Sequence, residues 1–190
     1  MSNAGTVNEV LTRSVGECGR LDYVSATAVA FKPYNGDALK INGAIYQIPA
    51  SGIVGLANTG VYVNGVAGQN LAASTRYYVY AFVNAGVVTG DFSTTTHATS
   101  TAAANSGVEI KSGDETRSLI GMVYTNASSQ FSNTYKSKLV ISWFNRLVNY
   151  SYGDHTNSYQ ASVLSPLAVM ASACDFVTWG EEAVFLGIHG

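Results

Sequence analysis

Acidic side chains are the first candidates for chemistry in this sequence, because two carboxylates that face one cleft can hydrolyse a glycosidic bond. Asp114 is followed directly by Glu115, and Glu181 by Glu182. Neighbouring side chains of a strand point to opposite faces of a sheet, so we expect neither pair to share a cleft. The carboxylates therefore do not favour a glycosidase, and we predict that the protein is not an enzyme.

The three histidines are the next candidates, as general bases or metal ligands. His155 follows Asp154 in a turn of Gly, Thr and Asn residues, where we expect a solvent-exposed loop tip. His97 falls in a stretch of low complexity, and His189 stands next to the last residue. The sequence has no zinc signature, phosphate-binding glycine loop, dinucleotide fingerprint or nucleophile elbow. We therefore predict no metal ion and no cofactor.

Aromatic side chains remain as binding groups, and the chain has twelve tyrosines, seven phenylalanines and two tryptophans. Most lie in strand-like runs, where aromatic residues usually pack in a core or on a sheet face. Four residues instead flank a polar turn and could stack on sugar rings or on another protein chain: Tyr150, Tyr152, His155 and Tyr159. These four are the predicted contact residues for a receptor or partner.

The composition favours assembly over free diffusion. Only 12% of the 190 residues are charged, about half the roughly 25% of an average soluble domain. The net charge is −2 with no basic stripe, so nucleic-acid binding is not expected. No apolar run approaches the about 20 residues of a membrane span, and the N-terminus lacks a signal-peptide pattern. We expect synthesis in the cytoplasm without a signal peptide, and no membrane insertion.

The two cysteines, Cys18 and Cys174, are far apart and show no metal-binding spacing. One interpretation is two reduced thiols, as in a chain made in a reducing compartment. The other is a disulfide bond between chains, since Cys18 lies in a small, polar segment that we expect to be exposed. Both interpretations remain open from the sequence.

A hairpin from Ala38 to Pro49 is the strongest local signal. Asn42-Gly43 separates two short apolar runs and suits a tight turn with positive φ at both central residues. A two-residue turn places Leu39 opposite Tyr46 and directs one side of the hairpin to the core.

Further short strands are predicted along the chain, with a long surface loop at residues 91–106 and no convincing helix. The strands are expected at residues 23–31, 61–63, 76–83, 87–89, 108–111, 117–125, 138–144, 147–152, 159–164, 175–179 and 183–188. Many short strands between Gly-, Asn- and Ser-rich turns predict an all-β fold, an antiparallel β-sandwich that is jelly-roll-like or an open barrel. We divide the chain into an extended N-terminal arm (1–22), a β-sandwich domain (23–146) and a C-terminal β segment (147–190), the last a truncated second β domain or an oligomerisation element.

Four phrases resemble segments of β-rich domains in tail fibre and other tail-associated proteins of bacteriophages and prophages: INGAIYQIP, RYYVYAF, GDETRSLIGMVYTNASSQF and KLVISWFNR. The resemblance covers residues 31–146, in the same order and with similar gaps, and none of its motifs is catalytic. In similar proteins a further β domain commonly follows the last phrase, and DFVTWGEEAV resembles its opening. The resemblance implies a virion location and a structural protein of a fibre, tail, neck or collar.

The predicted function is therefore a non-enzymatic virion protein that supports appendage attachment or host adsorption. We expect a homo-oligomer, such as a trimer or ring, that contacts other virion proteins through the N-terminal arm and the apolar C-terminal edge. The alternative is a carbohydrate-binding β-sandwich module, lectin-like or receptor-binding, for which a host-surface glycan would be the partner.

Overall fold

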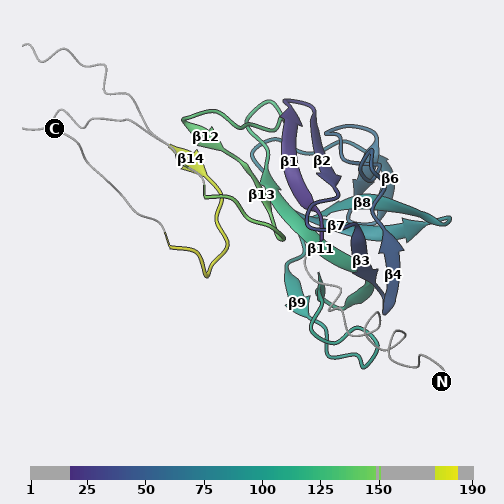
Figure 1. Ribbon diagram of the computed structural model, residues 1–190. Coiled ribbons are helices and arrows are strands. Elements are labelled where there is room, and N and C mark those ends of the chain that lie inside the picture. The colour runs from purple at the N-terminus through teal and green to yellow at the C-terminus, as the bar shows by residue number, and fades with distance from the viewer. Residues whose placement is uncertain (1–17, 149, 151–173, 184–190) are drawn as a thin grey trace, which may run out of the picture.

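The computed structural model describes residues 18–148, 150 and 174–183, which form an all-β structure without a helix in these ranges (Figure 1). The sequence prediction of an all-β fold is thus confirmed. The strands are β1 (Arg20–Ser25), β2 (Ala28–Lys32), β3 (Ala38–Ile41), β4 (Ala44–Gln47), β5 (Val61–Val63), β6 (Val66–Gln69), β7 (Arg76–Asn84), β8 (Val87–Ser93), β9 (His97–Thr99), β10 (Glu109–Lys111), β11 (Asp114–Tyr124), β12 (Ser137–Lys138), β13 (Val140–Ser142) and β14 (Asp175–Phe176).

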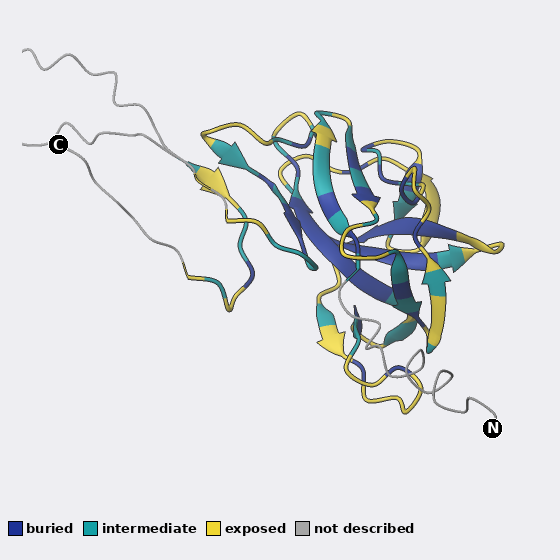
Figure 2. Ribbon diagram, in the orientation of Figure 1, coloured by how far each residue is buried: buried dark blue, intermediate teal, exposed yellow. Residues whose placement is uncertain are grey.

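A large sheet of eight strands is the centre of the molecule. Its order is β6-β5-β8-β7-β11-β10-β9, with β13 also paired to β11. Its pairings are antiparallel except for β5 with β8. Three two-stranded sheets accompany it: β1-β2, β3-β4 and the parallel pair β12-β14. Residues 77–82 of β7 and 118–123 of β11 are buried (Figure 2) because both faces of the large sheet are covered there.

Alternation along β7 separates two hydrophobic clusters, one on each face of the large sheet. Tyr77 and Val79 belong to the first cluster, whereas Tyr78 and Tyr80 belong to the second. This is the side-chain period of two expected of a strand. The first cluster is closed by residues of the β1-β2 and β3-β4 hairpins, among them Phe31, Leu39 and Ile41. The layers give the fold a sandwich-like character.

A β-bulge in β11 keeps both clusters filled. The register against β7 shifts between Leu119 and Gly121, which leaves Ile120 as the extra residue. The bulge changes the phase of the strand, so Leu119 and Met122 both face the second cluster although they are three positions apart. Gly121 is required here, because a Cβ would lie 2.4 Å from Leu21 Cδ2 and 2.7 Å from the Ile141 carbonyl oxygen.

The predicted hairpin at residues 38–49 is confirmed. In the β3-β4 pair, Leu39 lies opposite Tyr46 and Ile41 opposite Ala44. Asn42 and Gly43 have φ values of 49° and 78°, the positive values that a tight primed turn requires.

Three strand predictions were wrong in whole or in part, and one strand was missed. The described residues of the predicted strand 147–152 are not in a strand, and the predicted strand 175–179 ends at Phe176; the predicted strands 159–164 and, apart from its first residue, 183–188 lie outside the described residues. Residues 23–31 do not form one strand, because Ser25 pairs with Ala28 and the chain turns between β1 and β2. A Ser25 side-chain oxygen that accepts a hydrogen bond from Thr27 N–H supports this turn without Gly, Asn or Pro. The glycine-rich stretch at residues 51–70 contains a second strand, β6, in addition to the predicted strand at 61–63.

The predicted surface loop at residues 91–106 was also wrong. β8 continues through Ser93, and His97–Thr99 forms β9. Asp91 and Ser93 are completely buried, and Asn105 is 2% exposed. These polar residues are buried because each has hydrogen-bond partners in distant parts of the chain.

Candidate functional site

An aromatic cluster on the second face of the large sheet is the main concentration of side chains capable of binding. It consists of Tyr78 of β7, His97 of β9, Trp143 after β13 and Trp179 after β14. The His97 ring centroid lies 5.6 Å from that of Tyr78, 5.3 Å from that of Trp143 and 5.8 Å from that of Trp179. The two indoles meet edge to face at 4.8 Å. Four segments that are remote in sequence thus build one cluster.

Arg146 covers this aromatic cluster with positive charge. Its Cζ lies 4.5 Å from the Trp143 ring centroid and 5.4 Å from that of Trp179, within the range of cation–π attraction. Its guanidinium also binds Glu181 at 2.8 Å and Glu182 at 3.4 Å. The expectation that these adjacent carboxylates would diverge is therefore wrong. They lie in a turn closed by a hydrogen bond from Glu182 N–H to the Trp179 carbonyl, so strand alternation does not apply.

The turn of Trp179 and Glu182 is fixed by several further contacts. The Trp179 indole N–H donates to the Ser142 carbonyl at 3.0 Å, and its side chain is only 3% exposed. A Glu182 carboxylate oxygen accepts from the Trp179 backbone N–H at 2.9 Å. The pKa of the Glu181 carboxyl is lowered by hydrogen bonds from the Glu181 backbone N–H and from Arg146. Both carboxylates therefore form ion pairs with Arg146.

His97 is held by Glu109 from the neighbouring strand β10. Nδ1 of His97 lies 2.5 Å from a Glu109 carboxylate oxygen, and the Thr99 hydroxyl donates to the other oxygen. A carboxylate that orients an imidazole is a feature of catalytic triads. In the described part of the chain, however, the ring contacts of His97 are with Tyr78 and the two tryptophans. This arrangement supplies a fixed ring for packing or stacking.

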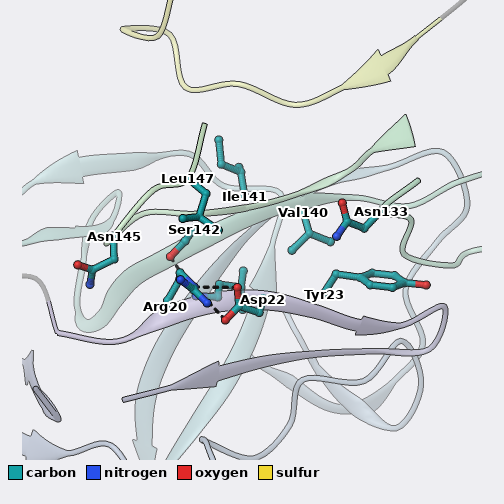
Figure 3. A pocket seen from close by; sticks show the side chains of 10 residues that line it. Arg20, Asp22, Tyr23, Asn133, Val140, Ile141, Ser142, Asn145 and Leu147 are labelled. Carbon is teal, nitrogen blue, oxygen red and sulfur yellow. Dashed lines mark hydrogen bonds and ion pairs between the residues drawn. The ribbon is translucent and has the colours of Figure 1, made fainter. Parts of the chain in front are cut away.

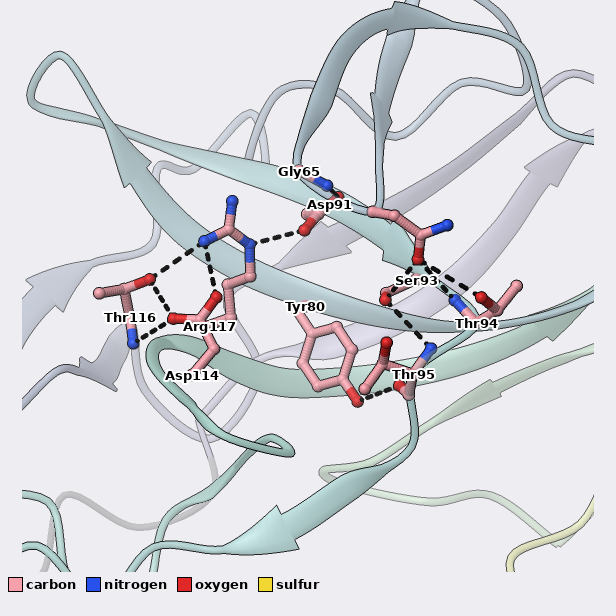
Figure 4. A network of polar contacts seen from close by, with 10 residues as sticks. Gly65, Tyr80, Asp91, Ser93, Thr94, Thr95, Asp114, Thr116 and Arg117 are labelled. Atoms are coloured by element: carbon pink, nitrogen blue, oxygen red, sulfur yellow. Dashed lines mark hydrogen bonds and ion pairs between the residues drawn. The ribbon is translucent and has the colours of Figure 1, made fainter.

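A buried ion pair joins Asp91 of β8 to Arg117 of β11, the two strands on either side of β7 (Figure 4). Asp91 is completely buried and accepts hydrogen bonds from Arg117 Nε at 2.6 Å and from Gly65 N–H at 3.0 Å. Arg117 also binds Asp114 at 2.9 Å. Burial raises the pKa of Asp114, but hydrogen bonds from Thr116 and the charge of Arg117 outweigh it, so the net shift is downward.

Two more polar contacts extend this framework. The Tyr80 hydroxyl donates to the Thr95 carbonyl at 2.9 Å, and burial raises the pKa of the phenol (Figure 4). Glu115 accepts hydrogen bonds from the Ser100 hydroxyl and from the Asn105 side-chain amide. Asp114 and Glu115 thus bind different partners on different segments, as the strand argument predicts. Glu115 positions the loop of Ser100 and Asn105, whereas Asp114 binds Thr116 and Arg117 of its own strand.

A small surface pocket lies between β1 and β13 (Figure 3). Its volume is about 70 Å³, far below the roughly 300–1,000 Å³ of typical ligand pockets. Arg20 and Asp22, which line it, bind each other at 2.8 Å. The remaining lining residues include Tyr23, Asn133, Val140 and Ser142. A pocket of this size accommodates a few water molecules or one small chemical group.

The predicted contact residues fall mostly outside the described ranges. Tyr150 is described and is 79% exposed, and its contact role stays a prediction. Tyr152, His155 and Tyr159 lie outside the described residues. Cys18 and Cys174 are half-buried and form no disulfide with each other, so both interpretations, reduced thiols and a bond between chains, stay predictions.

Sequence reasoning missed the aromatic cluster. The chain has only two tryptophans, and each precedes a charged residue by three positions or fewer, Trp143 before Arg146 and Trp179 before Glu181. This pairing of scarce residues was the available signal. In the described ranges, no group of three or more His, Cys, Asp or Glu residues could hold a metal ion. The same ranges contain no helix with the length and apolar character of a membrane span.

The aromatic cluster with Arg146 and the buried framework around Asp91 are thus the two organised sets of polar and aromatic side chains in the described structure. The first is partly accessible, with Arg146 26% exposed and Glu181 59% exposed, and the second is internal. No protein-family model matches this chain, and no curated protein or solved structure matches it.

Proposed function

We propose that this chain is a non-enzymatic structural protein of a bacteriophage virion, in a tail fibre, tail or neck and collar. It assembles as a homo-oligomer that supports appendage attachment or host adsorption. The resemblance of residues 31–146 to tail-associated β domains supports the virion setting. The low content of charged residues, 12%, supports assembly into an oligomer.

The observation that carries the proposal is the use of the charged side chains inside the β structure. Asp91 binds Arg117 and Gly65, Glu115 binds two loop residues, and Glu109 binds His97. Each contact joins segments that are distant in sequence or fixes a loop. A rigid scaffold needs such contacts, whereas a hydrolase needs carboxylates that face a substrate-sized cleft.

Light scattering of the purified native chain tests the proposal. We expect a trimer or a larger ring, and replacement of Asp154 or His155 should leave its mass unchanged. A monomer of 20 kDa at high concentration would contradict a self-assembling component. Repeating the measurement with a reductant tests the Cys18 and Cys174 hypothesis, because an interchain disulfide predicts a lower mass after reduction.

A second candidate function, carbohydrate binding, is favoured by the environment of Trp143. Its half-buried ring lies beside Arg146 and near the exposed Glu181, and sugar-binding surfaces combine an aromatic ring with such polar groups. A glycan array tests this function. We expect Trp143→Ala to abolish binding if the cluster is the site, and Tyr152→Ala or Tyr159→Ala to do so if the polar turn is. Absence of glycan binding by the wild-type chain would eliminate the candidate.

A further inference from the structure

The segment 174–183 docks on the large sheet and on β12 through backbone pairing, one buried tryptophan and two ion pairs. Asp175 and Phe176 form the parallel pair β12-β14 with Ser137 and Lys138. Val177 N–H donates to the Lys138 carbonyl at 3.0 Å. The Trp179 indole then enters the second hydrophobic cluster, and the turn that follows places two carboxylates on Arg146. These ten residues thus supply a backbone pairing, an aromatic anchor and two carboxylates.

The surface that receives this segment belongs wholly to the rest of the described chain. Tyr78, Leu119, Met122 and Ile141 form the second cluster from three strands of the large sheet, and Trp179 is its one fully buried member from outside that sheet. Removal of the segment would expose this apolar face to water. In the structure segment 174–183 covers this surface, and its aromatic ring, backbone pairing and two negative charges fit the surface chemically.

The length of the intervening chain permits that occupant to come from a neighbouring copy. Twenty-five residues separate residues 148 and 174. Such a connection spans at most about 80–90 Å, several times the radius of gyration of about 14 Å for a domain of roughly 130 residues. The contacts are the same whether the segment docks on its own chain or on a neighbour, so exchange sacrifices none of them.

We propose that the copies in the oligomer exchange segment 174–183. The segment of each chain then docks on a second copy, on the surface formed by Tyr78, Trp143 and Arg146. This proposal rests on the proposed function, because it specifies how the copies of a self-assembling chain are joined. It assigns Trp179 as the anchor and Arg146 as the charge partner across the interface. A buried aromatic anchor with an arginine partner is the usual composition of an interface hot spot.

Cysteine cross-linking in the full-length chain tests the exchange. Ser137 and Asp175 are register partners in neighbouring strands, a separation suited to a disulfide. In a background with Cys18→Ser and Cys174→Ser, a tagged chain with Ser137→Cys is co-expressed with an untagged chain with Asp175→Cys and then oxidised. Exchange predicts a disulfide-linked product containing one chain of each kind. The matched control replaces Asp175→Cys with Gln69→Cys, an exposed residue on β6 at the end of the large sheet opposite β9.

The outcomes separate this proposal from the proposed function. A mixed product at several times the level of the Gln69→Cys control would support exchange. A mixed product no more abundant than in that control would overturn it, especially if a single chain with both Ser137→Cys and Asp175→Cys closes its disulfide internally. If that chain is nevertheless oligomeric by light scattering, the proposed function survives without exchange. A wild-type monomer overturns both.

Discussion

Replacement of Asp91 by alanine should destabilise the protein more than replacement of Asp114, the other carboxylate that binds Arg117. Asp91 is completely buried, and its carboxylate is the partner of both Arg117 Nε and Gly65 N–H. Removal of one member of a buried ion pair typically costs about 3–5 kcal/mol, because the remaining charge stays buried without a partner. Arg117 retains Asp114 and is 16% exposed, so we expect the lower end, about 3 kcal/mol.

The assay is reversible thermal unfolding followed by circular dichroism. A domain of this size has an unfolding entropy of about 0.3 kcal/mol/K, so a loss of about 3 kcal/mol lowers Tm by about 10 °C. The matched control is Asp114→Ala, which removes the outer partner of the same guanidinium. That side chain is 29% exposed, and we expect a loss below about 1 kcal/mol.

A double variant tests the reasoning behind the magnitude. Asp91→Ala with Arg117→Met removes both charges, so no unpaired charge is buried and the loss should be smaller than for Asp91→Ala alone. The argument would be refuted if Asp91→Ala lowered Tm no more than Asp114→Ala did. It would also be refuted if the double variant were less stable than Asp91→Ala.

Four further predictions follow from individual residues. Gly43→Val should lower the free energy of unfolding by about 2 kcal/mol or more, because φ is 78° and a Cβ would lie 2.8 Å from a neighbouring side chain; an unchanged Tm would contradict this. Asp114→Asn should remove stability that the wild type has at neutral pH and loses as pH falls below about 4, since the folded-state pKa is lowered; urea titrations at pH 3 and 7 check the sign, and an equal difference at both would refute it. The predicted arm (1–22) overlaps β1, which begins at Arg20, so the arm hypothesis is tested on residues 1–17. Their deletion should weaken assembly in light scattering but leave the β circular dichroism spectrum intact, and loss of that spectrum would reject the arm hypothesis. Trp179→Ala should cost about 3 kcal/mol and shift the emission of Trp143 to the red, whereas unchanged emission would show that the indoles do not pack together.

The hairpin at residues 38–49 was predictable because its information is local. Asn42 and Gly43 alone specify the turn, and the turn length then determines the register of Leu39 against Tyr46. The alternation of Tyr77, Tyr78 and Tyr80 was predictable for the same reason, since the period of a strand is intrinsic to the backbone.

The stretch at residues 91–106 was not predictable from its own composition. Its polarity indicated exposure, but Ser93 donates to the Asn64 side chain and Asn105 donates to Glu115. A polar residue can be buried at little cost once a partner satisfies it, and the partner here lies 10 or 29 positions away. The sequence of a single chain does not reveal such pairs.

The adjacent carboxylates Glu181 and Glu182 show a different limit. The argument from alternation was physically correct for a strand, but β14 ends at Phe176 and a turn follows. Both side chains can therefore reach Arg146, which lies 36 positions before Glu182. The turn is stabilised by Trp179, whose own position depends on the distant β7 and β13. Local structure is decided here by tertiary contacts.

The two faces of the large sheet consequently differ in how they are closed. The first face is covered by β1-β2 and β3-β4, which are local hairpins that immediately precede the sheet in the chain. The second face is closed by Trp179, which follows residues 149–173 in the sequence. The segment that carries Trp179 pairs with the rest of the structure through only the two residues of β14. Local hairpins form with little loop-closure entropy, whereas a remote segment pays more for the same burial. If the proposed exchange between copies occurs, contact with another copy would replace contact within the chain at this face, and assembly would then depend on Trp179.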